Sequence, residues 1–172
     1  MSALADNWAM NRPELERVRI QHEDFDLTRE IAQLRAGDQG GGAIATFIDT
    51  VRDRSGTVAD TVRMELEHYP GMTERAIGKI VDEANARWQI IDCTVIHRYG
   101  ALQPNDRIVL VAVASGHRGD AFAACEFIMD YLKTRAPFWK KEHTPEGARW
   151  VDAKGTDEQA AERWKEIAGP RR

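Results

Sequence analysis

A cluster of cations between residues 133 and 141 is the part of the sequence best suited to chemistry. Lys133, Arg135, Lys140 and Lys141 occur there with no acidic residue among them. On a chain with a formal net charge of −4, such a cluster favours a pocket for a small anion. Mutual repulsion in a partly dry pocket would also favour a neutral amine, the form that accepts a proton in catalysis. The alternative is a solvated basic face, on which Lys133 only stabilises the C-terminal end of a helix.

The pair His117-Arg118 is a second candidate anion site, since it follows an expected strand and opens an expected helix. The first backbone N–H groups of a helix are free to bind an anion, and an arginine can hold a phosphate with two hydrogen bonds. Arg52 ends another expected strand, where the chain enters a polar loop of the kind that often lines sites. Each arginine can also be an ordinary surface residue, and His117 a structural one.

Other kinds of site find no support in the sequence. His97 and His117 do not stand at ligand spacing from another histidine or a cysteine, so no metal site is expected. Cys93 and Cys125 lie in apolar segments and are expected to be small core residues. The sequence contains no P-loop, GxGxxG or GxSxG motif. We therefore expect neither a metal nor a cofactor.

The composition indicates an ordinary globular chain. Its 172 residues are 42% hydrophobic and 30% charged, which suits one domain with a sizeable core. No apolar run approaches the ~20 residues that cross a membrane, and the N-terminus lacks the features of a secretory signal. An isoelectric point of about 5.8 disfavours a general nucleic-acid binder. With two cysteines and no disulfide framework, the expectation is a cytoplasmic protein without membrane or nucleic-acid partners.

The expected elements follow one another in a mixed order. Residues 1–16 are expected to form a loosely ordered extension, and residues 17–172 a single domain. Alternation and β-branched content predict strands at 18–25, 43–51, 61–69, 91–98 and 107–114, and a hairpin follows Pro137. Helical spacing predicts helices at 28–34, 73–88, 118–135 and 157–167, with Asp26 or Thr28 capping the first and Thr73 the second. This order predicts an α+β fold with a mainly antiparallel sheet.

The longest expected helix runs from about Arg118 to Arg135. Its buried stripe is expected to contain Phe122, Cys125, Ile128, Met129 and Leu132. Arg118 and Lys133 are separated by about 22 Å along this helix, at ~1.5 Å rise per residue. No proline or glycine pair lies between them to bend it. Both residues of one chain can therefore hardly touch one small substrate.

Four stretches of the sequence resemble the catalytic subunit of molybdopterin synthase. They are LEHYPGMTERAIGKIVDEA (66–84), VIHRYGALQPND (95–106), SGHRGDAF (115–122) and FIMDYLKTRAPFWKKEHTPEG (127–147). The last is the most specific, because it is long and rich in aromatic residues. The likeness covers about residues 40–150 and implies an α/β-hammerhead-like fold.

The resemblance implies a sulfurtransferase of molybdenum cofactor biosynthesis. Members of this family convert cyclic pyranopterin monophosphate into molybdopterin by building its dithiolene. The sulfur comes from the C-terminal Gly-Gly thiocarboxylate of a small ubiquitin-like subunit. The resemblance also places Arg118 and Lys133 in one substrate pocket, which a single straight helix does not allow. A homodimer that shares its sites resolves this conflict, as the core of a 2:2 heterotetramer.

The resemblance implies roles for individual residues. Lys133 and Lys140 are similar to the family's catalytic lysines. The positions similar to its substrate contacts are Thr50, Val51, Arg52, His117, Arg118, Lys133, Lys140, Lys141 and Glu142. The strand that ends at Arg52 often reads F-x-G-x-V-R in the family, and here Asp49 stands at the glycine. This departure bears on how closely the backbone can approach a ligand at that point.

Two other functions fit parts of the sequence. A non-enzymatic docking module could bind the flexible C-terminal tail of a protein in a basic groove, without affinity for a phosphorylated pterin. The presence of Lys133, Lys140, Arg52, His117 and Arg118 together favours the enzyme, because tail docking alone needs no second anion site. A small RNA-binding domain is disfavoured by the acidic isoelectric point, and binding with a steep salt dependence would revive it.

Overall fold

The computed structural model describes residues 13–36, 41–52, 63–151 and 155–166. The helices in these ranges are α1 Glu14–Arg17, α2 Leu27–Ala36, α3 Met72–Arg87, α4 Arg118–Arg135 and α5 Gly155–Glu166. The strands are β1 Val18–Gln21, β2 Ala43–Thr50, β3 Arg63–His68, β4 Ile90–Arg98, β5 Gly100–Leu102, β6 Arg107–Ser115, β7 Phe138–Thr144 and β8 Gly147–Val151. Most of the extension expected over residues 1–16 lies outside the described residues.

The strands form two four-stranded sheets. The first has the order β1-β4-β6-β2, in which β1 is parallel to β4 and the other pairs are antiparallel. The second has the order β5-β3-β7-β8 and is antiparallel throughout. The predicted α+β class with mainly antiparallel pairing is confirmed. The division into two sheets and the short strand β5 were not predicted.

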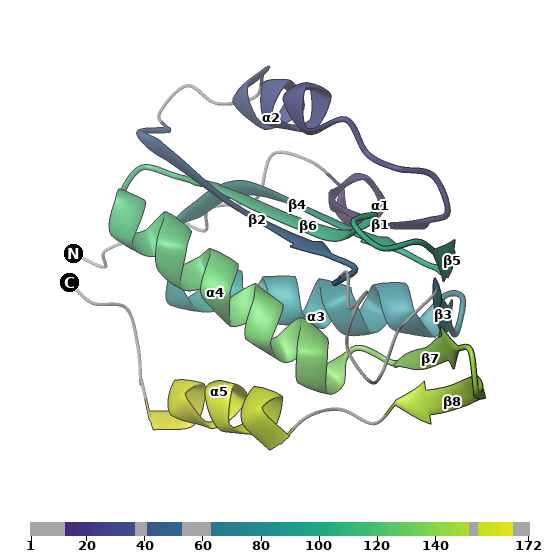
Figure 1. Ribbon diagram of the computed structural model, residues 1–172. Helices are drawn as coiled ribbons and strands as arrows, with labels where there is room; N and C mark the ends of the chain where they lie inside the picture. Colours follow the sequence, from purple (N-terminus) through teal and green to yellow (C-terminus); the bar gives the residue numbers. More distant parts are fainter. Residues whose placement is uncertain (1–12, 37–40, 53–62, 152–154, 167–172) are drawn as a thin grey trace, which may run out of the picture.

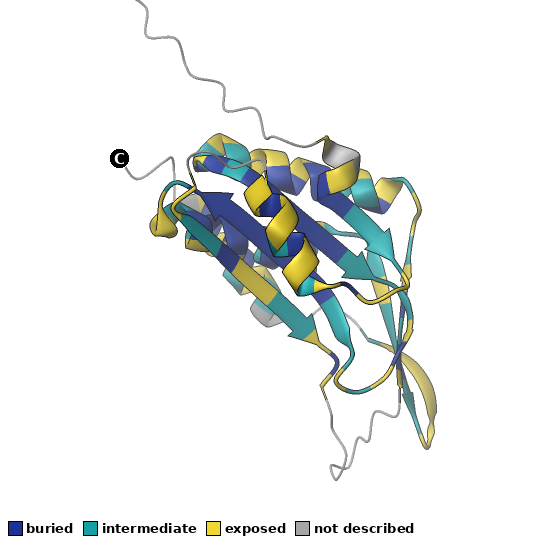
Figure 2. Cartoon of the chain, turned by 90° about the horizontal axis from the view of Figure 1, so that it is seen from above, coloured by how far each residue is buried: buried dark blue, intermediate teal, exposed yellow. Residues whose placement is uncertain are grey.

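Helices cover both faces of the first sheet. Helix α2 lies on one face, and α3 and α4 lie on the other (Figure 1). Figure 2 looks onto the sheet from the side of α2. The outer side of this helix is exposed, and the central strands beneath it are buried. Strand β6 is fully buried from Val109 to Ser115. Its nearly continuous apolar sequence fits this position, since a strand covered on both faces needs no polar side.

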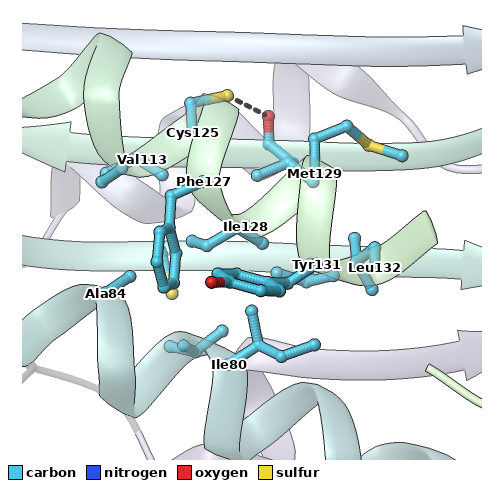
Figure 3. Close-up of a cluster of buried hydrophobic side chains, with 14 of the residues drawn as sticks. Ile80, Ala84, Val113, Cys125, Phe127, Ile128, Met129, Tyr131 and Leu132 are labelled. Atoms are coloured by element: carbon cyan, nitrogen blue, oxygen red, sulfur yellow. Dashed lines mark hydrogen bonds between the residues drawn. The ribbon is translucent and has the colours of Figure 1, made fainter. Parts of the chain in front are cut away.

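The main core lies between α3, α4, α5 and the first sheet. Phe127 of α4 is fully buried, and its ring packs edge-on against those of Tyr131, Trp88 and Trp164 at 4.6, 5.3 and 5.5 Å (Figure 3). Cys125 lies in the same layer, where its thiol donates a hydrogen bond to the carbonyl of Val111 at 3.7 Å. This packing fixes α4, and with it the last turn of the helix, against the sheet.

The helix starts differ partly from the predicted ones. Of the two predicted caps of α2, the structure has Asp26, whose carboxylate accepts hydrogen bonds from the N–H groups of Thr28 and Arg29 at 2.9 and 3.2 Å. The prediction that Thr73 caps α3 is wrong. The cap is Gly71, whose φ of 79° suits glycine, and its N–H donates to the Glu74 carboxylate at 2.6 Å. Thr73 is buried inside the first turn.

Helix α4 begins and ends at the predicted residues, but its buried face is partly different. Phe122 was expected in the buried stripe and is 68% exposed. The other four residues of the predicted stripe are buried, and so are Ala121 and Ala124, which were not predicted. One residue turns a helix by about 100°, and the step from Ala121 to Phe122 carries the phenyl ring away from the sheet. Within the described ranges, no helix has the length and apolar character to cross a membrane.

Candidate functional site

A cavity of about 400 Å³ lies where the two sheets meet, beside the C-terminal end of α4. The end of β2, the last turn of α4 and the start of β7 supply most of its polar groups. Its lining residues are Phe47, Asp49, Thr50, Val51, Arg52, Met64, Leu66, His97, Ile108, Leu132, Lys133, Ala136, Phe138, Lys140, Glu142, Val151 and Asp157. Six of the nine predicted site residues are therefore brought together here: Thr50, Val51, Arg52, Lys133, Lys140 and Glu142.

The chain after β2 is held by hydrogen bonds that bring Arg52 to the cavity. The N–H of Val51 donates to the carbonyl of Asp106 at 2.9 Å, and the N–H of Asn105 donates to the carbonyl of Val51 at 2.8 Å. Asn105 has a φ of 71°, a left-handed conformation that asparagine tolerates in turns. The side chain of Arg52 is exposed at the cavity.

Each predicted catalytic lysine lies against a carboxylate. The Lys133 ammonium is 2.5 Å from Asp49 Oδ2, and the Lys140 ammonium is 2.9 Å from Glu142 Oε1. Glu142 is only 4% exposed, and Arg149 reaches its other oxygen at 3.4 Å. A carboxylate so deeply buried needs such cationic partners. The cations of segment 133–141 therefore have acidic partners outside it: Asp49 comes from β2, and Glu142 follows Lys140 by two residues.

Lys141 lies on the other side of the second sheet. Successive residues of a strand point to opposite faces, so Lys140 and Glu142 face the cavity while Lys141 faces outward. Its ammonium is 5.2 Å from the centre of the exposed Trp150 ring. Lys141 does not line the cavity of its own chain.

His117 and Arg118 are at the far end of α4 from the cavity. His117 is the N-cap of the helix and Arg118 its first residue, and both are exposed. The helix continues to Arg135 without interruption and passes across the face of the first sheet to β7 (Figure 1). The expected separation of Arg118 from Lys133, about 22 Å, follows from this geometry. Neither residue lines the cavity of its own chain.

His97 lines the cavity and was not among the predicted site residues. Its ring stacks on that of Phe138 at 3.7 Å and 17°, and Nδ1 is 2.8 Å from the carbonyl oxygen of Arg98. A carbonyl only accepts hydrogen bonds, so Nδ1 carries the proton and Nε2 is an acceptor in the neutral ring. Burial lowers the pKa of His97 to about 4, helped by the positive charge of Lys133. In the strand β4, alternation places His97 on the same face as Val95 and Cys93, so its inward orientation could have been predicted from the sequence.

This lowered pKa predicts a loss of stability in acid. Between pH 6.5, the ordinary pKa of histidine, and about 4, the unfolded chain binds a proton at His97 that the folded protein excludes. The free energy of unfolding should therefore fall as the pH drops through this window, by up to about 3 kcal/mol. His97→Phe keeps a ring beside Phe138 and removes the titration. Denaturant unfolding across the window should give a flatter curve for the variant, and parallel curves would contradict the prediction.

Comparison with known proteins places the chain in a family. The family described as MoaE protein matches residues 20–135. A curated protein of Ralstonia nicotianae, named molybdopterin synthase catalytic subunit, is 65% identical over 147 residues, which are 86% of this chain and 83% of the relative.

Solved structures agree with this assignment. The molybdopterin biosynthesis MoaE protein of Burkholderia ambifaria has a TM-score of 0.76 and 56% identity, covering 88% of this chain and 99% of that one. The molybdopterin synthase of Staphylococcus aureus has a TM-score of 0.71 and 32% identity, covering 82% and 98%. Sequence and structure together show that this chain belongs to the MoaE protein family.

Proposed function

We propose that this chain is the catalytic subunit of a molybdopterin synthase. It would transfer sulfur from the C-terminal thiocarboxylate of a small ubiquitin-like subunit to cyclic pyranopterin monophosphate, forming the dithiolene of molybdopterin. The observation that carries the proposal is one cavity lined by Arg52, Lys133 and Lys140 in a chain 65% identical to a named catalytic subunit. The cytoplasm is the expected location.

The cations of the cavity suit a phosphorylated substrate. Among the described residues, none forms an ion pair with Arg52 that would compete for a phosphate, whereas Lys133 and Lys140 each have a carboxylate partner. Arg52 would therefore anchor the phosphate. Cations at the phosphoryl oxygens stabilise the charge that develops when the cyclic phosphate opens. Lys133 would be the principal acid and base and position the tail of the small subunit, assisted by Lys140.

The sulfur is proposed to come from the partner because neither cysteine of this chain suits a sulfur carrier. Cys93 and Cys125 are both buried. Burial also raises the pKa of the Cys125 thiol to about 12, which disfavours the reactive thiolate. A thiocarboxylate brings its own sulfur nucleophile into the cavity. Water must then hydrolyse the resulting acyl intermediate, a step for which a lysine can move the proton.

Product formation is the direct test of the proposed function. The purified chain is incubated with the thiocarboxylated small subunit and cyclic pyranopterin monophosphate, and the dithiolene product is measured. The same mixture with an unmodified carboxylate tail is the control and should give no product. Binding of the tail without product, and without affinity for the cyclic pterin, would instead support the docking module.

Arg118 is predicted to hold the substrate phosphate from a second copy of the chain. Arg118→Ala should weaken binding of the cyclic pterin by roughly 10- to 150-fold, the equivalent of a lost charge-assisted hydrogen bond of about 1.5–3 kcal/mol. Titration calorimetry measures this change. The helix should remain folded, because Arg118 is exposed at its first position. An unchanged affinity would argue against the assignment.

A further inference from the structure

The ion pair between Lys133 and Asp49 joins two elements that are distant in the sequence. Lys133 stands in the last turn of α4, and its ammonium donates to Asp49 Oδ2 at 2.5 Å. The other oxygen of the same carboxylate, Oδ1, accepts the N–H of Thr50 at 3.0 Å. Both oxygens are thus engaged, one by the backbone of β2 and one by the lysine. The backbone bond fixes the direction in which the carboxylate meets the ammonium.

The pairing of β2 with β6 is irregular next to Asp49. Asp49 pairs with Val109 of β6, but Thr50 pairs with Arg107, so Ile108 has no partner in the register. An extra residue of this kind bends the strands and redirects side chains, and such bulges often lie next to sites. Asp49, Thr50 and Ile108 all line the cavity.

The pairing of Lys133 differs from that of Lys140. The carboxylate beside Lys140, that of Glu142, is buried and shared with Arg149. The carboxylate beside Lys133 is 26% exposed, and Arg149 does not reach it. An anion entering the cavity therefore meets the negative charge of Asp49 within a few ångströms of the lysine that attracts it.

We propose that Asp49 is a counter-charge that weakens the hold of Lys133 on anions in the cavity. The ammonium has three donors, so it can contact a bound anion without leaving Asp49. The carboxylate then repels that anion at close range. The role deepens the proposed function and rests on it, because weaker binding of anions speeds the release of an anionic product and of the spent carboxylate tail. Asp49 acts through Lys133 and is an affinity-setting residue rather than a catalytic one.

Inorganic phosphate is a suitable probe, because its binding does not depend on turnover. Asp49→Asn removes the charge and keeps an oxygen to accept the Thr50 N–H. A phosphorus NMR titration at low ionic strength, where screening is weakest, should give a Kd about 4- to 20-fold lower than that of the unmodified protein. Asp82→Asn changes the net charge equally, and Asp82 is exposed on α3 and does not line the cavity. Solvent screening should therefore leave the Kd of this variant within about twofold.

A second measurement reports on the ion pair itself. Labelling by an amine-reactive reagent, followed by peptide mass spectrometry, should be several-fold faster at Lys133 in Asp49→Asn. Lys140 keeps Glu142 and is the internal reference, whose labelling should not change. Asp49→Ser, which also offers the Thr50 N–H an acceptor, gives the same test should the asparagine variant fold poorly.

The two readings separate this inference from the proposed function. Tighter phosphate binding with faster labelling of Lys133 supports the counter-charge, whether or not the chain forms molybdopterin. An unchanged Kd in both variants, or no saturable phosphate binding in any of the proteins, overturns it. Failure of the product assay alone would count against the proposed function and leave these binding results standing.

Discussion

Replacing Lys133 with alanine is expected to lower the rate of product formation by about 100- to 10,000-fold, the range lost with a general acid or base. Lys133 lines the cavity at the end of α4, beside the Asp49 carboxylate and close to His97. No other described lysine occupies this position, since Lys140 lies on β7 against Glu142. The variant therefore loses the amine proposed to move protons and to position the tail.

The fold should survive this change. Lys133 is 43% exposed, and its ion pair with Asp49 is of the partly exposed kind that contributes about 0.2–1 kcal/mol. Thermal unfolding should therefore resemble that of the unmodified protein. Lys140→Ala should also be damaging. Lys141→Ala is the matched comparison and should be less damaging, because this neighbouring lysine faces Trp150 outside the cavity of its own chain. Turnover like that of the unmodified protein in Lys133→Ala would refute the catalytic role.

Elements controlled by local interactions were predicted well. Helix α4 begins and ends at the predicted residues. Its end could be predicted because Pro137 excludes the helical conformation at the residue before it. Asp26 was one of the two predicted caps of α2, since a capping side chain bonds to N–H groups two or three residues away. Such signals are complete within a short stretch of sequence, so no tertiary information is needed to use them.

Features that depend on tertiary contacts were missed. The exposed Phe122 and the buried Ala121 differ by one helical position, and only the direction in which the sheet lies decides between them. The partition into two sheets follows from strand pairing, such as β3 with β7, that joins residues far apart in the chain. Hydrophobic patterns show that a strand is half buried and do not identify its neighbours.

The candidate site also combines residues that the sequence identifies with tertiary contacts that it does not. Glu142 was predicted together with Lys133 and Lys140, but the pairing of Lys133 with Asp49 was not, because this contact spans 84 positions. His97 was not predicted as a site residue, although the alternation of β4 puts it on the buried face. Its stacking on Phe138 is a tertiary contact that the sequence does not show. The resemblance to a family supplied the candidate residues, and the geometry supplied their partners.

The distance between Lys133 and Arg118 leads to the second large effect, because α4 is one unbroken helix with these residues near its two ends. The cavity of one chain contains Lys133, Lys140 and Arg52 but neither His117 nor Arg118. A two-fold dimer in which the start of one α4 lies near the cavity of its mate would create two equivalent composite sites. Substitutions at opposite ends of α4 should then complement each other between subunits.

Lys133→Ala and Arg118→Ala proteins are each expected to have little activity. When they are mixed under conditions of subunit exchange, random pairing makes about half of the dimers mixed. Each mixed dimer has one intact site and one doubly altered site. Activity should therefore return to about a quarter of that of the unmodified protein. A mixture of Lys133→Ala with Lys140→Ala is the matched control. Those two residues line the same cavity, so every site in a mixed dimer keeps one lesion and no activity should return. Verified exchange without recovery in the first mixture would show that the sites are not shared, and that His117 and Arg118 serve another purpose than binding the substrate.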